Sequence, residues 1–108
     1  MNDAQIYALL GNLCEGRVFP AVAPQGTKQP WVIFTLPSET GDDVFCGQSG
    51  FTATTLQVDV YAKVIDEATA LRDRVELALV PLLPTSLLKT KGYETDTGLH
   101  RATIEVQV

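Results

Sequence analysis

The sequence has little of what catalysis and metal binding usually need. Its 108 residues contain one histidine, His100, and two cysteines, Cys14 and Cys46. A single histidine without a second ligand or an oriented nucleophile makes no site, so we expect His100 to be an ordinary strand or surface residue. The two cysteines are too few for a disulfide framework and match no zinc-binding spacing. We therefore predict no catalytic residue, no metal and no cofactor.

Positive charge and long apolar runs are scarce as well. The chain has 8 Lys and Arg against 13 Asp and Glu, which gives a net charge of −5. Such a chain repels nucleic-acid phosphates, so we expect no direct nucleic-acid partner. No apolar run approaches the roughly 20 residues that cross a bilayer, and residues 1–3 lack the features of a signal peptide. We expect a cytosolic protein without a membrane partner, with both cysteines reduced; a disulfide in a particle that leaves the cell stays open.

The apolar content suffices for one hydrophobic core. Hydrophobic residues make up 45% of the chain and charged residues 19%, proportions that are usual for a globular protein. A length of 108 residues corresponds to one domain, and no internal repeat or linker divides the chain. We predict a single domain over residues 1–108.

Two segments have the apolar spacing of amphipathic helices. The first runs from Asp3 to Cys14, with Gly16 placed to end it, and the second covers residues 67–80 after a possible Asp66 cap. The apolar stripes consist of Ile6, Leu9, Leu10 and Leu13 in the first helix and of Ala68, Leu71, Val75, Ala78, Leu79 and Leu82 in the second.

The second helix also has a polar outer side. Arg72 and Glu76 have the i,i+4 spacing of an ion pair there, and Leu77 lies off the apolar stripe. Pro81 and Pro84 end the helix, because proline has no amide hydrogen to donate.

Five segments have the composition or alternation of strands: Val18–Ala23, Trp31–Leu36, Thr54–Ala62, Leu87–Thr95 and Leu99–Val108. The clearest is Thr54–Ala62, in which apolar and polar residues alternate strictly, so that one side of the strand faces the core. The last two segments predict a hairpin around residues 96–98. Trp31–Leu36 is apolar on both sides, which indicates a strand inside the sheet or covered by a partner.

Residues 38–50 separate two of these strands and are rich in glycine and acidic residues. They include Asp42 and Asp43, and we expect a mobile loop that becomes ordered only against a neighbouring protein. Its acidic residues lack the spacing of a calcium-binding loop, and Gly47-Gln48-Ser49-Gly50 lacks that of a hydrolase nucleophile.

These elements predict an α+β fold with the order α-β-β-β-α-β-β. Two amphipathic helices and one-sided strands combine most simply as a two-layer sandwich, with both helices on one face of a mixed or antiparallel sheet of four to five strands. The other face would be polar, and it serves either solubility or contact with a protein. Its residues would be Gln57, Asp59, Tyr61, Arg101, Glu105 and Gln107.

The stretch Val18-Phe19-Pro20-Ala21-Val22-Ala23-Pro24-Gln25-Gly26-Thr27, followed by Pro30-Trp31-Val32-Ile33-Phe34, resembles a family of small phage and prophage tail-completion proteins. The second half also matches, in Leu56-Gln57-Val58-Asp59-Val60-Tyr61-Ala62 and in the helix that opens with Glu67-Ala68. The matching segments lie between residues 18 and 79. Their pattern of prolines, glycine and alternating residues contains no catalytic signature.

The resemblance implies a non-enzymatic role in virion assembly. The family is similar to the tail terminators of long-tailed phages, whose rings cap the tail tube and meet the head connector, and by analogy the ring has six subunits. It implies assembly in the host cytoplasm, followed by a place in the virion tail. A head-to-tail neck adaptor and a free-standing protein-binding module remain alternatives. The candidate interface residues are Trp31, Ile33, Asp42, Asp43, Tyr61 and Leu77.

Overall fold

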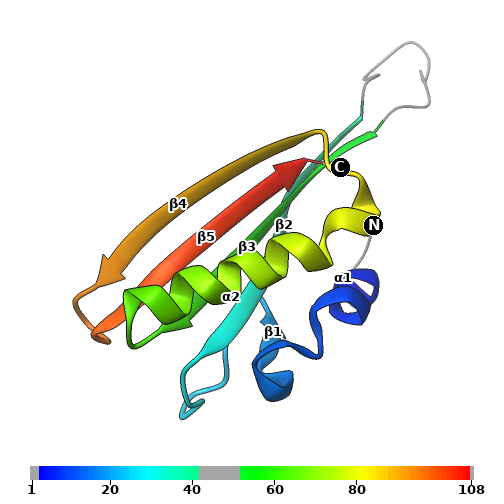
Figure 1. The fold of residues 1–108 in the computed structure, drawn as a ribbon. Helices are drawn as coiled ribbons and strands as arrows, with labels where there is room; N and C mark the ends of the chain where they lie inside the picture. The colour runs from blue at the N-terminus through cyan, green and yellow to red at the C-terminus, as the bar shows by residue number, and fades with distance from the viewer. Residues whose placement is uncertain (1–2, 42–51, 108) are drawn as a thin grey trace.

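A computed structural model describes residues 3–41 and 52–107, and Figure 1 shows how their elements are arranged. The chain order is α1 (Asp3–Leu10), the 3-10 turn η1 (Leu13–Gly16), β1 (Val18–Pro20), β2 (Trp31–Gly41), β3 (Thr52–Ala62), α2 (Ile65–Ala78), the 3-10 turn η2 (Val80–Leu82), β4 (Ser86–Glu94) and β5 (Leu99–Gln107).

The five strands form one mixed sheet in the order β1-β2-β3-β5-β4. β1 runs parallel to β2, and all other neighbouring strands are antiparallel. Both helices lie on the same face of this sheet, with α2 across β3 and β5 and α1 beside β1 and β2 (Figure 1). The predicted α+β architecture is therefore confirmed, and its sheet is mixed.

Apolar and polar residues alternate strictly along β3 and β5. The apolar residues form the sheet side of the hydrophobic core, which we call the floor. Leu56, Val58, Val60 and Ala62 of β3 point toward the helices together with Ala102, Ile104 and Val106 of β5, and none of these side chains is more than 1% exposed. Leu71 and Val75 of α2 pack on this floor together with Leu79, the residue that caps the end of the helix. The helix therefore lies on one face of the sheet, as the sequence predicted.

The first helix is shorter than the sequence predicted, because it ends at Leu10 and not at Cys14. A Cβ atom at Gly11 would lie 2.7 Å from the carbonyl oxygen of Tyr7, so only glycine fits this turn. Cys14 and Glu15 then have left-handed backbone angles, with φ of 51° and 56°. Leu13 is still buried, as the apolar stripe predicted.

The strand boundaries also differ from those predicted. β1 ends at Pro20 and not at Ala23, because Ala21 has a φ of 66° that no strand can accommodate. β2 passes Pro37 and continues to Gly41, with a shift in register between Thr35 and Ser38. A β-bulge of this kind tolerates proline, since it interrupts the hydrogen bonds of the ladder.

The loop expected over residues 38–50 is thus only partly a loop. Residues 38–41 belong to β2, where they pair with β3. The remainder of the expected loop lies outside the described residues, so its mobility stays a prediction.

The second helix begins and ends two residues earlier than predicted. Its N-cap residue is Val64, and Asp66 lies in the first helical turn. A carboxylate in this turn still interacts favourably with the positive end of the helix dipole. Arg72 and Glu76 do not form the expected surface pair. Arg72 is buried and donates from Nη1 to the carbonyl oxygen of Thr90 at 3.0 Å, and Glu76 pairs with Lys89 at 2.5 Å. Both side chains therefore connect α2 to β4.

The predicted hairpin at the C-terminal end of the described chain is confirmed. β4 and β5 pair from Ser86 opposite Gln107 to Glu94 opposite Leu99. The connecting turn closes with a hydrogen bond from the Gly98 amide to the Glu94 carbonyl at 2.9 Å, and Gly98 has a φ of 70° that suits glycine. β4 is consequently the last strand on its side of the sheet.

Replacing Val75 with aspartate should destabilise the protein by more than about 3 kcal/mol, because an unpaired carboxylate cannot be buried in this core without a large cost. Chemical denaturation monitored by circular dichroism measures the loss. Leu77→Asp is the matched control, since Leu77 lies on the same helix but is 72% exposed. A Val75→Asp protein that unfolds at the parent's denaturant midpoint would contradict the packing of α2.

Candidate functional site

The sheet face turned away from the helices, which we call the open face, brings together three of the predicted interface residues. Trp31 and Ile33 on β2 lie opposite Tyr61 and Asp59 on β3. The Trp31 ring stacks on the Tyr61 ring, with centroids 5.5 Å apart and planes inclined by 24°. The indole Nε1 of Trp31 is buried and has no hydrogen-bond partner. Two neighbouring strands thus form an aromatic cluster with Ile33 beside it.

The sequence of β2 is apolar on both sides, but only the side that faces the helices is fully buried. Val32 and Phe34 are fully buried under the helices, whereas Trp31 and Ile33 are half-buried on the open face. The strand does lie inside the sheet, between β1 and β3, as predicted. Its second apolar side is therefore partly accessible surface.

Asp59 is the most enclosed charged group of the open face. It is 9% exposed, and both carboxylate oxygens accept hydrogen bonds: Oδ1 from the Thr103 hydroxyl at 2.5 Å and Oδ2 from the Gln57 amide at 3.1 Å. The sequence placed Gln57 and Asp59 on one side of a strand, but Thr103 is adjacent only because β5 pairs with β3. Two donors offset part of the cost of burying this carboxylate.

Arg101 links the aromatic cluster to the edge of the sheet. It lies opposite Tyr61, and its Nη1 is 3.6 Å from a carboxylate oxygen of Glu94. Gly92 leaves room for it, since a Cβ atom there would come within 3.2 Å of the guanidinium. Burial and the nearby carboxylates of Asp59 and Glu94 raise the pKa of the Tyr61 phenol, and a hydrogen bond to Arg101 partly opposes the shift. The open face is therefore an ordered polar network.

Leu77 lies on the other side of the sheet, in the helix layer. It belongs to a group of exposed apolar residues where α2 ends and β4 begins, which we call the apolar corner: Leu77, Val80, Leu83 and Leu87. The structure does not bring Leu77 together with Trp31 and Ile33, so the predicted interface residues fall on two separate surfaces. Asp42 and Asp43 lie outside the described residues.

Leu83 is the most exposed residue of the apolar corner, at 80%, and its backbone is left-handed with a φ of 53°. Leucine rarely adopts this conformation, which costs about 1–2 kcal/mol for residues other than glycine and is easier for asparagine. Leu83 was not among the interface residues that we predicted from the sequence. Pro84 and the end of the apolar stripe indicated only a turn there. Leu83 thus combines an exposed apolar side chain with a backbone conformation that is costly for leucine.

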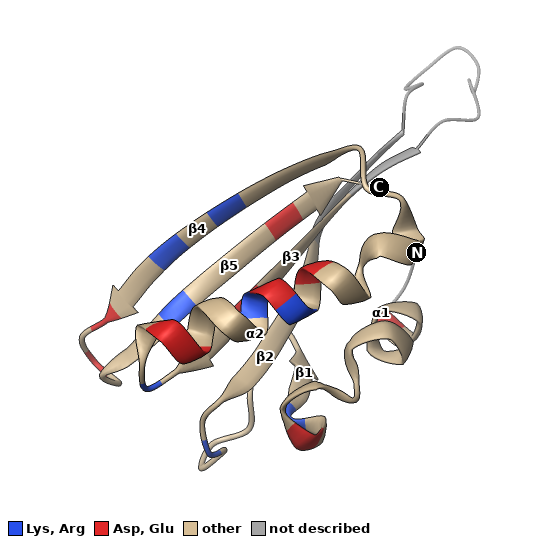
Figure 2. Cartoon of the chain, in the orientation of Figure 1, with Lys and Arg blue, Asp and Glu red and all other residues tan. Residues whose placement is uncertain are grey.

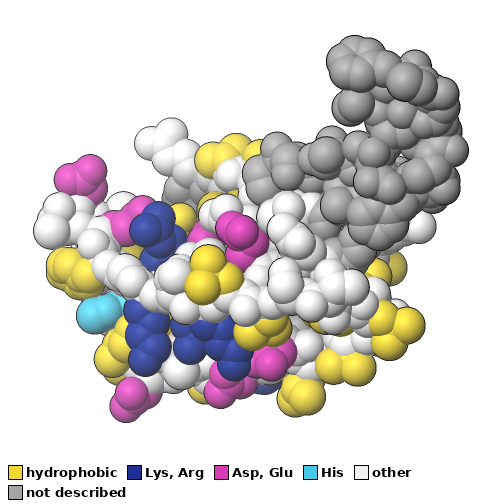
Figure 3. Space-filling model, turned by 90° about the horizontal axis from the view of Figure 1, so that it is seen from above, with side chains coloured by type: hydrophobic (Ala, Val, Ile, Leu, Met, Phe, Trp, Pro, Cys, Tyr) yellow, Lys and Arg dark blue, Asp and Glu magenta, His cyan; other side chains and the backbone are white. Residues whose placement is uncertain are grey.

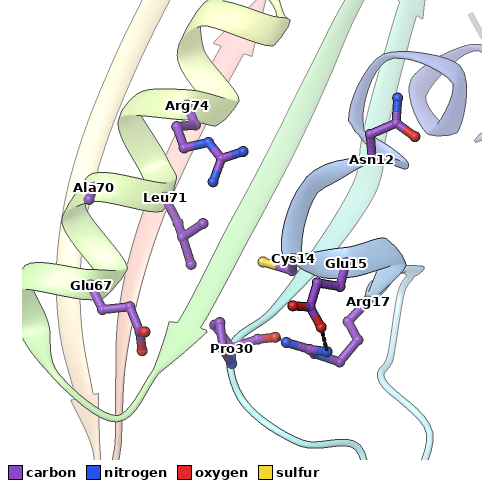
Figure 4. Close-up of a pocket in the computed structure, with 9 residues that line it drawn as sticks. All are labelled: Asn12, Cys14, Glu15, Arg17, Pro30, Glu67, Ala70, Leu71 and Arg74. Atoms are coloured by element: carbon purple, nitrogen blue, oxygen red, sulfur yellow. Dashed lines mark hydrogen bonds and ion pairs between the residues drawn. The ribbon is translucent and has the colours of Figure 1, made fainter.

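A cleft of about 560 Å³ lies between α2 and η1 (Figure 4). Its walls carry charges of both signs, from Glu15, Arg17, Glu67 and Arg74. Arg17 is already engaged, because its Nε donates to the Pro30 carbonyl at 2.9 Å and its Nη1 lies 3.3 Å from Glu15. The cleft therefore contains one ion pair, Arg17 with Glu15, and its charges are of both signs and form no convergent set of like charges.

Cysteine and histidine are the two reactive residue types of interest, and Cys14 and His100 both pack against neighbouring side chains. Burial raises the pKa of the Cys14 thiol in the wall of the cleft, which leaves it a weak nucleophile. His100 packs its ring against Tyr93, with centroids 4.9 Å apart. Within residues 3–41 and 52–107, no three His, Cys, Asp or Glu side chains are grouped so that they could hold a metal ion. Cys46 is not among the described residues.

Charges of both signs occur on the same elements. Figure 2 shows basic and acidic residues on each of α2, β4 and β5. Seen from above, basic side chains gather in the middle of the surface with acidic side chains beside them, and apolar side chains surround them (Figure 3). No helix in the described part of the chain is long and apolar enough to cross a membrane.

Comparison with known proteins gives one result for the whole chain. A family model described as "Tail completion protein gp17" matches residues 1–108. None of the curated proteins matches the sequence.

The raised pKa of Tyr61 predicts a loss of stability at alkaline pH. The folded state holds the phenolic proton more tightly than the unfolded chain, so the free energy of unfolding falls as the pH rises above the ordinary value of 10.0. Tyr61→Phe should reduce this decline in urea denaturation curves recorded between neutral pH and the alkaline range. Tyr7→Phe, which removes an exposed phenol, is the control. Equal slopes for Tyr61→Phe and the parent would contradict the assignment.

Proposed function

The chain belongs to the family of tail completion proteins, and from this premise we propose that it caps the finished tail tube of a phage and joins it to the head connector. The family assignment places the protein in phage tail assembly. The proposal goes further in naming the tail tube protein and a head connector or neck protein as the two partners. The match over residues 1–108 is the observation that supports it, because the family model covers every residue of the chain.

A role by contact and without catalysis agrees with the chemistry of the described surface. The thiol of Cys14 is buried, and His100 is packed against Tyr93. The features that stand out are the aromatic cluster of the open face and the apolar corner, and both suit contacts with proteins. We therefore assign the protein no enzymatic reaction.

The working form in this proposal is a closed ring, with six subunits by analogy with tail terminators. A tube with cyclic symmetry can be covered completely only by a matching cyclic assembly, in which each subunit uses two different surfaces toward its two neighbours. The open face around Trp31 and the side of α2 around Leu77 are different surfaces on opposite sides of the sheet, which meets this requirement. Repeated weak contacts around the ring supply the affinity for the tube.

The place of action follows from the same proposal. Tails are assembled in the host cytoplasm, and the protein then stays in the virion tail. It is also proposed to act as one domain over residues 1–108, since the family match spans all of them.

Polymerisation of the tail tube protein from the same phage, with and without this protein, tests the function. Electron microscopy of negatively stained tubes should show shorter tubes with rings at their ends. Trp31→Ala and Leu77→Glu should each reduce the fraction of capped tubes, because each alters one of the two surfaces.

Val64→Asn is the matched control, since Val64 is 55% exposed and lies outside both surfaces. This variant should cap tubes like the parent. Tubes that reach the same length with and without the protein would overturn the capping role. Binding of the protein to the connector alone would then favour the neck adaptor.

A further inference from the structure

The contacts between α2 and β4 leave one buried donor without a partner. Arg72 of α2 is 6% exposed, and its Nη1 donates to the Thr90 carbonyl oxygen of β4 at 3.0 Å. Its Nε is buried as well and has no hydrogen-bond partner. Leaving a donor of a charged group buried and unpaired is costly, so such donors are rare in native proteins. The Nε–H group of Arg72 is therefore the first element of a candidate binding site.

Two lysines lie beside Arg72 on the strand that it contacts. Lys89 reaches α2, where it forms an ion pair with Glu76. Side chains two residues apart in a strand point to the same side, so Lys91 lies on the side of the sheet that carries α2 as well. Lys91 is exposed and forms no ion pair within residues 3–41 and 52–107. We call Arg72, Lys89 and Lys91 the basic edge.

The basic edge stands out in an acidic protein. The chain has a net charge of −5 and 8 Lys and Arg, three of which belong to this group. Asp73 follows Arg72 on α2, but it is exposed and forms no ion pair within the described residues. β4 lies along the upper side of the sheet in Figure 1, and the view from above in Figure 3 shows basic side chains gathered in the middle. With Glu76 as their one paired carboxylate in the described structure, these three cations attract a further negative charge.

We propose that the basic edge binds a carboxylate of an acidic segment of another protein, between the Nε of Arg72 and the ammonium group of Lys91. A guanidinium donates through neighbouring N–H groups to both oxygens of one carboxylate, and such charge-assisted pairs are strong. The bond from Nη1 to Thr90 holds the guanidinium in place before binding. The exposed Lys91 side chain moves to admit the carboxylate and then pairs with it.

The contacts of the basic edge favour a carboxylate over the phosphates of a nucleic acid. Glu76 shows that a carboxylate fits this surface, because it already binds Lys89. A nucleic acid brings a row of phosphates, and several cations have to compensate their repulsion from a chain of net charge −5. Arg72 and Lys91 alone are without an ion pair here, which suits the side chain of an aspartate or glutamate in a partner protein.

Nuclear magnetic resonance of the ¹⁵N-labelled protein observes the Nε–Hε group of Arg72 directly. Hexaglutamate peptide is the probe, and hexaglutamine peptide is the uncharged control of the same length. Hexaglutamate should move the Arg72 Hε signal downfield, because a hydrogen bond to a carboxylate deshields the proton, and it should shift the amides of residues 89–92. Hexaglutamine should leave these signals in place. An Arg72 Hε signal that hexaglutamate does not move overturns the proposal.

Lys91→Glu tests the second cation of the site. Lys91 is exposed, so the variant should keep the parent's thermal midpoint. It should weaken hexaglutamate binding by at least about fivefold, because it replaces an attraction with a repulsion. Lys28→Glu is the matched control, since it makes the same change of charge at an exposed position in the loop before β2, and it should bind like the parent. Equal weakening in both variants would reduce the effect to net charge and overturn the proposal.

Two further titrations test the kind of occupant. Hexathymidylate, a single-stranded DNA of similar charge, should bind more weakly than hexaglutamate. Tighter binding of the DNA with the same Arg72 Hε shift would assign the site to nucleic acid and overturn the assignment to a protein segment. Raising the concentration of the protein alone should leave the Arg72 Hε signal in place, and a shift would assign the site to a second copy instead.

The inference goes beyond the proposed function, because neither Trp31 nor Leu77 belongs to the basic edge. The titrations use the purified protein without any tail component. A protein that caps tubes but does not bind hexaglutamate retains the capping role and loses the site assigned here. A protein that binds hexaglutamate through Arg72 but never caps tubes retains the site and loses the capping role.

Discussion

The rest of the structure depends on the contact between one face of α2 and the apolar floor of β3 and β5. Val75 and the leucines on either side of it are buried against side chains that alternate along both strands. The contact uses one face of the sheet only, since both helices lie on that side (Figure 1). No helix in the described chain covers the opposite face, so its own side chains have to make that face compatible with water. The two outer edges of the described sheet are not covered by a helix either.

The open face meets this requirement through pairs between strands. Trp31 stacks on Tyr61, Arg101 reaches Glu94, and the Asp59 carboxylate accepts bonds from two neighbours. Such pairs fix the conformations of the surface side chains before any partner binds. Less side-chain conformational entropy is then lost on binding. An ordered, partly aromatic surface is well suited to a protein that assembles with others, as members of a tail completion family do.

The two outer edges of the described sheet differ from each other. One edge is the nine-residue β4, joined to α2 by the contacts of Arg72 and Lys89. The other is the three-residue β1, and beyond it β2 has no described strand beside it on that side. Lys89 and Lys91 lie on β4, and lysines on an outer strand discourage unspecific pairing with other sheets.

The sequence by itself determined the elements whose signal is local. Alternation predicted β3 and β5, helical spacing predicted α2 with Val75 inside and Leu77 outside, and a string of short motifs led to the family. Tertiary structure alone decided the end of the first helix at Gly11, where a Cβ atom would meet the Tyr7 carbonyl, and the partners of Arg72 and Glu76 on β4. It also decided the enclosure of Asp59 by Thr103. The physical reason is that periodicity reports which side of an element is apolar, whereas strand order and close approach depend on residues that are distant in the chain.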